Sequence, residues 1–151
     1  MAKDIPRPQA SEILQKTRVE ISPETFTLIS LNQEDWFKLL ENPELSPRMT
    51  APFMIFRDRF EVTLLLDEID FERLRDSVGG SRREGEFRLL TFDTVLDFNV
   101  VGFLAEVSRV LAEAQISIIA LSAFSRDHIL IKQSDLPAAL EALGEVVEEI
   151  C

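Results

Sequence analysis

The stretch "DFNVVGFLAEVSRVLAEAQISIIALSAFSRDHILIK", residues 97–132, carries the clearest structural signals of the chain. Its middle part has the period of an α-helix, because apolar residues recur on one side of a helical wheel. The pattern predicts an amphipathic helix that begins at residue 103. The apolar stripe consists of Phe103, Leu104, Val107, Val110, Leu111 and Ala114.

Two strands are predicted after this helix. "ISIIALSAF", residues 116–124, is rich in β-forming residues, "SRD" turns the chain, and "HILIK", residues 128–132, is the return strand. Both faces of residues 116–124 are mostly apolar. A sheet that carries its helices on one face must bury an apolar second face against something else. We therefore expect the two halves of the chain to pack on each other, a homodimer, or both.

The flanking segments complete a repeating order of elements. A strand is predicted at about residues 87–92, and Ser134 caps a last helix whose stripe runs through Leu143 to Ile150. The order strand–helix–strand–strand–helix is the split βαβ, ferredoxin-like (βαββαβ) plan without its last strand. Because the predicted helix reaches the end of the sequence, no strand is expected after it. Either the unit is truncated, or residues 19–21 or the other half of the chain fill that edge.

The first half shows the same order. A strand at residues 24–31 precedes a helix capped by Asn32, a hairpin joins residues 53–56 to 60–66, and Asp67 caps a further helix. "GGSRREGE", residues 79–86, is typical of a joint. The sequence therefore predicts an α+β protein with an N-terminal arm at 1–20, a first unit at 21–84 and a second unit at 85–151.

Composition limits the function. The chain has 151 residues, 16 Lys and Arg against 27 Asp and Glu, and a net charge of −11. This charge repels nucleic-acid phosphates and anionic membrane surfaces, so neither is expected as a partner. A single cysteine, a single histidine and no visible pair of catalytic groups predict no metal, no cofactor and no enzyme activity. The lack of a signal-peptide pattern and of a long apolar run predicts a cytoplasmic protein.

The six residues "DFNVVG", residues 97–102, admit two interpretations. Gly102 serves a turn with positive φ or a close backbone approach, or it opens a helix N-terminus whose free N–H groups could receive a carboxylate. Asp127 likewise caps a turn or pairs with a ligand amine. Donors at a helix start and an acceptor at a strand start would together suit a zwitterion.

The segment "FNVVGFLAEVSRVLAEAQISIIALSAFSRDHILIKQSDLPAALEAL" resembles the ACT domain. It is most similar to the CASTOR-type group, the cytosolic arginine sensors and their small bacterial relatives. The matching features are the loop that ends in Gly102, the helix "GFLAEV", the strand "ISI" and the segment "LSAFSRDHILI". Many ACT loops carry a proline before this glycine, where the present chain has Val101.

The resemblance implies two tandem ACT-like units packed through their sheets, the first of them degenerate. It implies a non-catalytic regulatory module that binds a small molecule, usually an amino acid, at an interface between ACT units, with a protein partner as a further expectation. On this basis Ser122 and Asp127 would serve the ligand amine. The ligand carboxylate would face Asn99, Val100, Val101 and Gly102. The alternative is a structural module that mediates oligomer or partner contacts and whose ligand site is degenerate.

Overall fold

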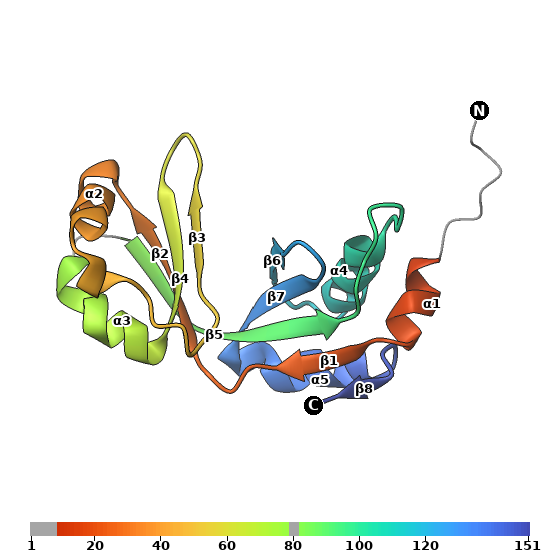
Figure 1. The fold of residues 1–151 in the computed structure, drawn as a ribbon. Coiled ribbons are helices and arrows are strands. Elements are labelled where there is room, and N and C mark those ends of the chain that lie inside the picture. The colour runs from red at the N-terminus through yellow and green to blue at the C-terminus, as the bar shows by residue number, and fades with distance from the viewer. Residues whose placement is uncertain (1–8, 79–81) are drawn as a thin grey trace. The chain divides into compact units, whose positions relative to one another are not determined.

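The computed structural model describes residues 9–78 and 82–151, which form two compact units of helices and strands (Figure 1). One unit combines Met1–Pro23 with Arg88–Cys151, and we call it the terminal unit. The other, Glu24–Phe87, is the inserted unit. The predicted α+β, ferredoxin-like fold class is confirmed, and each unit is described separately below.

The inserted unit contains a complete βαββαβ order. Its strands pair in the order β3-β4-β2-β5, which is the order of the ferredoxin-like sheet. Figure 1 shows α2 and α3 on one face of these strands. The elements are β2 (Phe26–Leu31), α2 (Gln33–Glu41), the 3-10 turn η1 (Pro43–Leu45), β3 (Met54–Arg57), β4 (Val62–Asp67), α3 (Glu68–Leu74), η2 (Arg75–Ser77) and the first part of β5 (Arg82–Asp93).

The terminal unit continues β5 and repeats the plan. Its strands pair in the order β6-β7-β5-β1-β8. Strand β1 is antiparallel to β5 and therefore occupies the place of the fourth ferredoxin-like strand, while β8 pairs with β1 in parallel. The elements are α1 (Ala10–Gln15), β1 (Arg18–Ile21), α4 (Phe103–Glu113), β6 (Ile119–Ser122), β7 (Asp127–Lys132), η3 (Gln133–Asp135), α5 (Leu136–Gly144) and β8 (Glu149–Ile150).

The C-terminal segment corrects the sequence-based expectation. Helix α5 ends at Gly144, and the strand β8 follows it, so the prediction that no strand follows the last helix was wrong. The reason is hydrogen bonding to the N-terminal segment. The Glu148 N–H donates to the Thr17 carbonyl at 2.9 Å, and the Cys151 N–H donates to the Val19 carbonyl at 2.8 Å. These bonds satisfy backbone groups near the C-terminus. In a longer helix the same groups would have been paired within the helix.

Two further segments have more regular structure than their composition suggested. The described part of the predicted arm at 1–20 contains α1 and β1. Of the predicted joint, residues 79–81 lie outside the described residues, and residues 82–86 belong to β5. The pairing of β5 with β2 shifts register between Phe26 and Leu28, and Glu86 has a φ of 61°. This irregularity is a β-bulge within a continuous strand.

Each unit has its own apolar core. In the terminal unit, α4 and α5 bury Val107, Leu111 and Leu143 against strand residues such as Phe92. In the inserted unit, α3 contributes Phe71 and Leu74 to a cluster with β2 and β4. Within residues 9–78 and 82–151, no helix combines the length and the apolar character needed to cross a lipid bilayer.

The role of β1 can be tested with two neighbouring substitutions. Val19 is fully buried in the terminal core, whereas Glu20 on the same strand is exposed. We expect Val19→Ala to lower the free energy of unfolding by about 2 kcal/mol, through lost burial and a residual cavity. Glu20→Ala should change it by less than about 0.5 kcal/mol. Urea denaturation followed by circular dichroism measures both, and equal effects would contradict the burial of β1.

Candidate functional site

The loop at residues 94–102 joins β5 to α4 and is held by two backbone hydrogen bonds. The Leu96 N–H donates to the Ser125 carbonyl at 2.9 Å, which ties the loop to the turn between β6 and β7. The Val100 N–H donates to the Asp97 carbonyl at 3.0 Å and closes a tight turn within the loop. The loop therefore lies beside the β6–β7 hairpin.

The backbone conformation of Gly102 explains why a glycine precedes the helix. Gly102 is the residue before α4, and its φ of 87° and ψ of 10° lie in the left-handed region. A Cβ built at this position would meet no described atom within 4 Å. The backbone dihedral, rather than close packing within this chain, is therefore what favours glycine here. Because glycine has no side chain, it also leaves the N-terminus of α4 without a side-chain cap.

The β6–β7 hairpin places polar groups opposite this loop. Ser122 and Asp127 are paired residues at the turn end of the hairpin, and the Ser122 hydroxyl donates to Asp127 Oδ1 at 2.7 Å. In the turn between them, the Ala123 N–H donates to the Arg126 carbonyl at 2.9 Å. Arg126 Nε donates to Asp93 Oδ1 at 2.9 Å, which joins the turn to the end of β5.

The loop and the hairpin enclose a hollow of about 300 Å³. Four of the six predicted site residues line it, namely Val100, Gly102, Ser122 and Asp127. Asn99 and Val101 lie on the same loop, are exposed, and do not line the hollow. The remaining lining residues are Leu96, Asp97, Phe98, Phe103, Leu104, Ala123, Phe124, Ser125 and Arg126.

Sequence reasoning treated three of these lining residues only as turn formers or apolar positions. Asp97 was assigned to the turn, Phe124 to a strand face and Arg126 to the "SRD" turn. The signal that could have found them is their position, because each lies directly next to a predicted site segment. With Asp97 and Asp127 against Arg126, the hollow carries more carboxylate than cationic charge.

Two exposed aromatic residues stand at the rim of the hollow. The exposed fractions of Phe98 and Phe124 are 95% and 91%. Their rings meet edge to face, with centroids 6.5 Å apart. Val95 and Val101 of the same loop are exposed as well. A cluster of exposed apolar side chains beside a polar hollow is typical of a surface that another molecule covers.

The strand-to-helix connection that corresponds to residues 94–102 is much shorter in the inserted unit. There a single residue, Asn32, separates β2 from α2. Its side-chain oxygen accepts from the Asp35 N–H at 2.8 Å, so the chain itself caps the helix N-terminus. The inserted unit thus has no counterpart of the loop at 94–102.

His128 lies on β7 directly after Asp127. Its Nδ1 is 2.9 Å from Thr91 Oγ1 on β5. Burial of the ring lowers the pKa of His128, and Arg126 lowers it further, while Asp127 acts in the opposite direction. The neutral imidazole is therefore the favoured form in the folded chain.

The order of elements and the strand pairing of both units define the ferredoxin-like fold. Residues 82–145 match the family model described as the ACT domain. This match supports the resemblance to the ACT domain over that stretch. A search of curated proteins gave no match.

Solved structures resemble nearly the whole chain. A Vibrio cholerae protein of unknown function is 25% identical, has a TM-score of 0.66, and the match covers 90% of this chain and 94% of that one. A protein from Agrobacterium tumefaciens is 16% identical, with a TM-score of 0.65 and coverage of 90% and 92%. The regulatory subunit of aspartate kinase from Thermus thermophilus, in its ligand-free form, is 11% identical, with a TM-score of 0.59 and coverage of 83% and 96%. These likenesses support the fold over nearly the whole chain.

The lowered pKa of His128 predicts a pH dependence of stability. Below about pH 6.5 the unfolded chain binds this proton more readily than the folded chain, so stability falls as the pH falls toward the lowered pKa. The loss should be small, because water screens a half-buried ring. Urea denaturation at several pH values measures it. His128→Gln should flatten this part of the profile, and an unchanged slope in that variant would contradict the assignment.

Proposed function

We propose that the protein is a non-catalytic regulatory module that binds an amino acid in the hollow of the terminal unit. The single observation that carries the proposal is the juxtaposition of the loop at 94–102 with Ser122 and Asp127 around one hollow. The ACT match over residues 82–145 supports a regulatory ligand-binding role.

The two sides of the hollow suit the two ends of an amino acid. The Asp127 carboxylate and the Ser122 hydroxyl offer acceptors to an ammonium group. On the other side, the first-turn N–H groups of α4 and the positive end of its dipole favour a carboxylate. Val100 and Gly102 line this side. Asn99 and Val101 remain predicted contacts, from the same loop, for a ligand that extends beyond the hollow.

We further propose that a second copy of the chain covers the rim, so that the ligand lies at an interface between ACT units. The exposed Phe98 and Phe124 support this part of the proposal, because burying two aromatic rings is strongly favourable. The same proposal includes membership of the CASTOR-type group, a protein partner and a cytoplasmic location. The segment "LSAFSRDHILI" and the single cysteine support them.

Amino-acid binding can be tested by calorimetric titration of ligand-free protein with each of the twenty amino acids. We expect saturable heat for at least one of them, with one site per chain, because Asn32 closes the matching place in the inserted unit. Asp127→Asn should weaken binding about tenfold or more, since a charge-assisted hydrogen bond is lost. Asp135→Asn, in η3 and outside the hollow, is the matched control.

Gly102 offers a second variant for the same titration. Gly102→Val would force a β-branched residue into the left-handed region and should distort the loop and abolish binding. Gly102→Asn, which tolerates this region better, should retain more of it. No heat with any amino acid would favour the alternative, a structural module with a degenerate ligand site.

The dimer is tested by analytical ultracentrifugation. We expect the unmodified protein to sediment as a dimer at micromolar concentration, and the double variant Phe98→Ser, Phe124→Ser to sediment as a monomer. Phe60 in the inserted unit is equally exposed, so Phe60→Ser serves as the control for a general loss of surface apolarity. A double variant that dimerises like the unmodified protein would exclude this surface.

A further inference from the structure

The inserted unit contains a cavity that the proposed amino-acid site does not use. It has a volume of about 250 Å³ and lies between α2, the segment that begins with η1, and the strands β3 and β4. Helix α3 contributes one wall residue. The lining consists of Trp36, Leu39, Leu40, Pro43, Leu45, Ser46, Pro47, Ile55, Leu64 and Leu74.

The chemistry of this lining restricts what could enter. None of the lining residues carries a charge, although charged residues make up 28% of the chain. A charged ligand would lose its hydration without gaining an ionic partner, which is strongly unfavourable. The Trp36 indole and the Ser46 hydroxyl are the polar side-chain groups of the lining; the indole N–H can donate one hydrogen bond, and the hydroxyl can both donate and accept. The cavity is therefore suited to a neutral, mainly apolar molecule.

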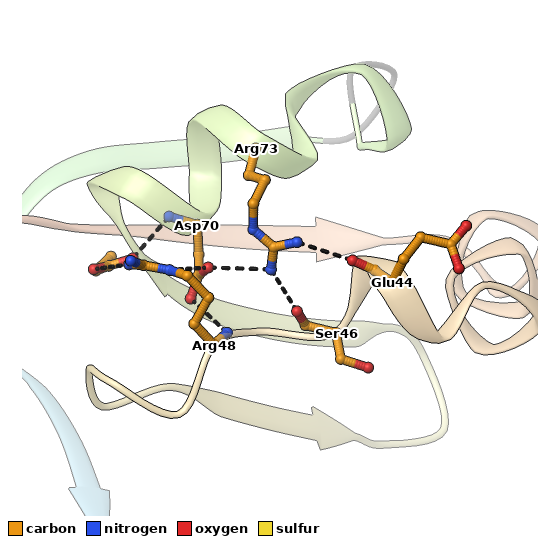
Figure 2. Close-up of polar contacts among 6 residues, drawn as sticks. Glu44, Ser46, Arg48, Asp70 and Arg73 are labelled. Carbon is orange, nitrogen blue, oxygen red and sulfur yellow. Dashed lines mark hydrogen bonds and ion pairs between the residues drawn. The ribbon is translucent and has the colours of Figure 1, made fainter.

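The wall formed by residues 43–48 is fixed by a network of ionic and hydrogen-bonded groups (Figure 2). Arg48 Nε donates to Asp70 Oδ1 at 2.9 Å, and its backbone N–H donates to Asp70 Oδ2 at 3.1 Å. Arg48 also pairs with Asp67 at 3.0 Å. Asp67 and Asp70 are only 2% and 1% exposed, so these pairs are largely shielded from water.

Arg73 of α3 also holds this segment. Its guanidinium donates to the carbonyls of Glu44 and Ser46, and it lies 3.3 Å from Asp70. Figure 2 shows Arg73 between Asp70 and these two carbonyls. Pro43 and Pro47 further limit the backbone freedom of the wall. A segment fixed in this way resists collapse into the space beneath it, and the cavity is preformed.

We propose that this cavity is a second binding site, which takes a neutral molecule about the size of one aromatic ring. Apolar cavities of about 150 Å³ already accept benzene, so the volume allows a ring with a small polar substituent. The polar groups of Trp36 and Ser46 would orient that substituent. The site goes beyond the amino-acid site, because it lies in the inserted unit and excludes zwitterions.

The test uses benzyl alcohol and benzoate as a matched pair of neutral and charged probes on the full chain. Trp36 is the only tryptophan and lies on the cavity wall, so its fluorescence reports occupancy directly. We expect benzyl alcohol to change this fluorescence along a saturation curve and benzoate to leave it unchanged. A linear, unsaturated response to benzyl alcohol, or equal binding of both probes, would overturn the proposal.

Two variants locate the binding. Leu45→Phe adds volume into the cavity and should abolish the saturable response. Phe37→Leu changes an α2 residue that is 51% exposed and outside the lining, and should leave the response unchanged. Should Leu45→Phe fail to fold, methyl NMR of the unmodified chain decides the question. Probe-induced shifts are expected for the methyl groups of Leu39, Leu64 and Leu74, and shifts elsewhere alone would refute the site.

The test is independent of the amino-acid site. Asp127→Asn should lose amino-acid binding and keep the response to benzyl alcohol, whereas Leu45→Phe should show the opposite pattern. If the amino-acid titration fails while benzyl alcohol still saturates, only the proposed function falls. If benzyl alcohol fails while an amino acid binds, only the second site falls.

Discussion

The hydrogen bonding of β5 determines where the candidate site forms. Its second half is central in the sheet of the terminal unit, with β1 on one side and β7 on the other, so its backbone groups are satisfied on both edges. Because β5 is fixed in this way, Asp93 at its end meets Arg126 of the β6–β7 turn. The loop that follows must then run beside the hairpin, and the hollow arises between them. The site is thus a consequence of strand pairing, and Gly102 supplies the turn that leads into α4.

The sequence predicted the parts of this arrangement that depend on local patterns. Helix α4 has a strong period and begins at Phe103 as expected. The hairpin was predicted, but its turn comprises residues 123–126 rather than "SRD", and Asp127 belongs to β7 and pairs with Ser122. Four of the six predicted site residues could therefore be placed around the hollow. The orientations of Asn99 and Val101 depend on the loop's internal hydrogen bonds, which no sequence period encodes.

The parts that sequence reasoning missed depend on partners far away in the chain. Residues 19–21 were one of the alternatives left open for the last edge of the sheet, and the choice depends on β5 and β8, which offer β1 its hydrogen bonds. Val147 and Ile150 continue the helical spacing of α5, yet pairing with the N-terminal segment outweighs that local preference. The polar start of β5 resembles a linker by composition, since an exposed strand needs few apolar residues. Each miss is a case of tertiary pairing overriding a local pattern.

The two units show how one fold can support different surfaces. In the terminal unit a long β–α loop leaves a helix N-terminus uncapped and opposes it to carboxylates. In the inserted unit Asn32 caps the corresponding helix, and the cavity lies instead beside a proline-containing segment.

The buried Asp67 and Asp70 explain why this cavity persists. Two shielded carboxylates need cationic partners, and removing either partner would leave a costly unpaired charge. Arg48 and Arg73 therefore remain paired with these carboxylates. The segment at residues 43–48 that they hold cannot move onto the apolar residues of the cavity. The ionic pairing of Arg48 and Arg73, rather than apolar packing, thus determines the position of this segment, and it leaves the apolar residues beside it incompletely covered.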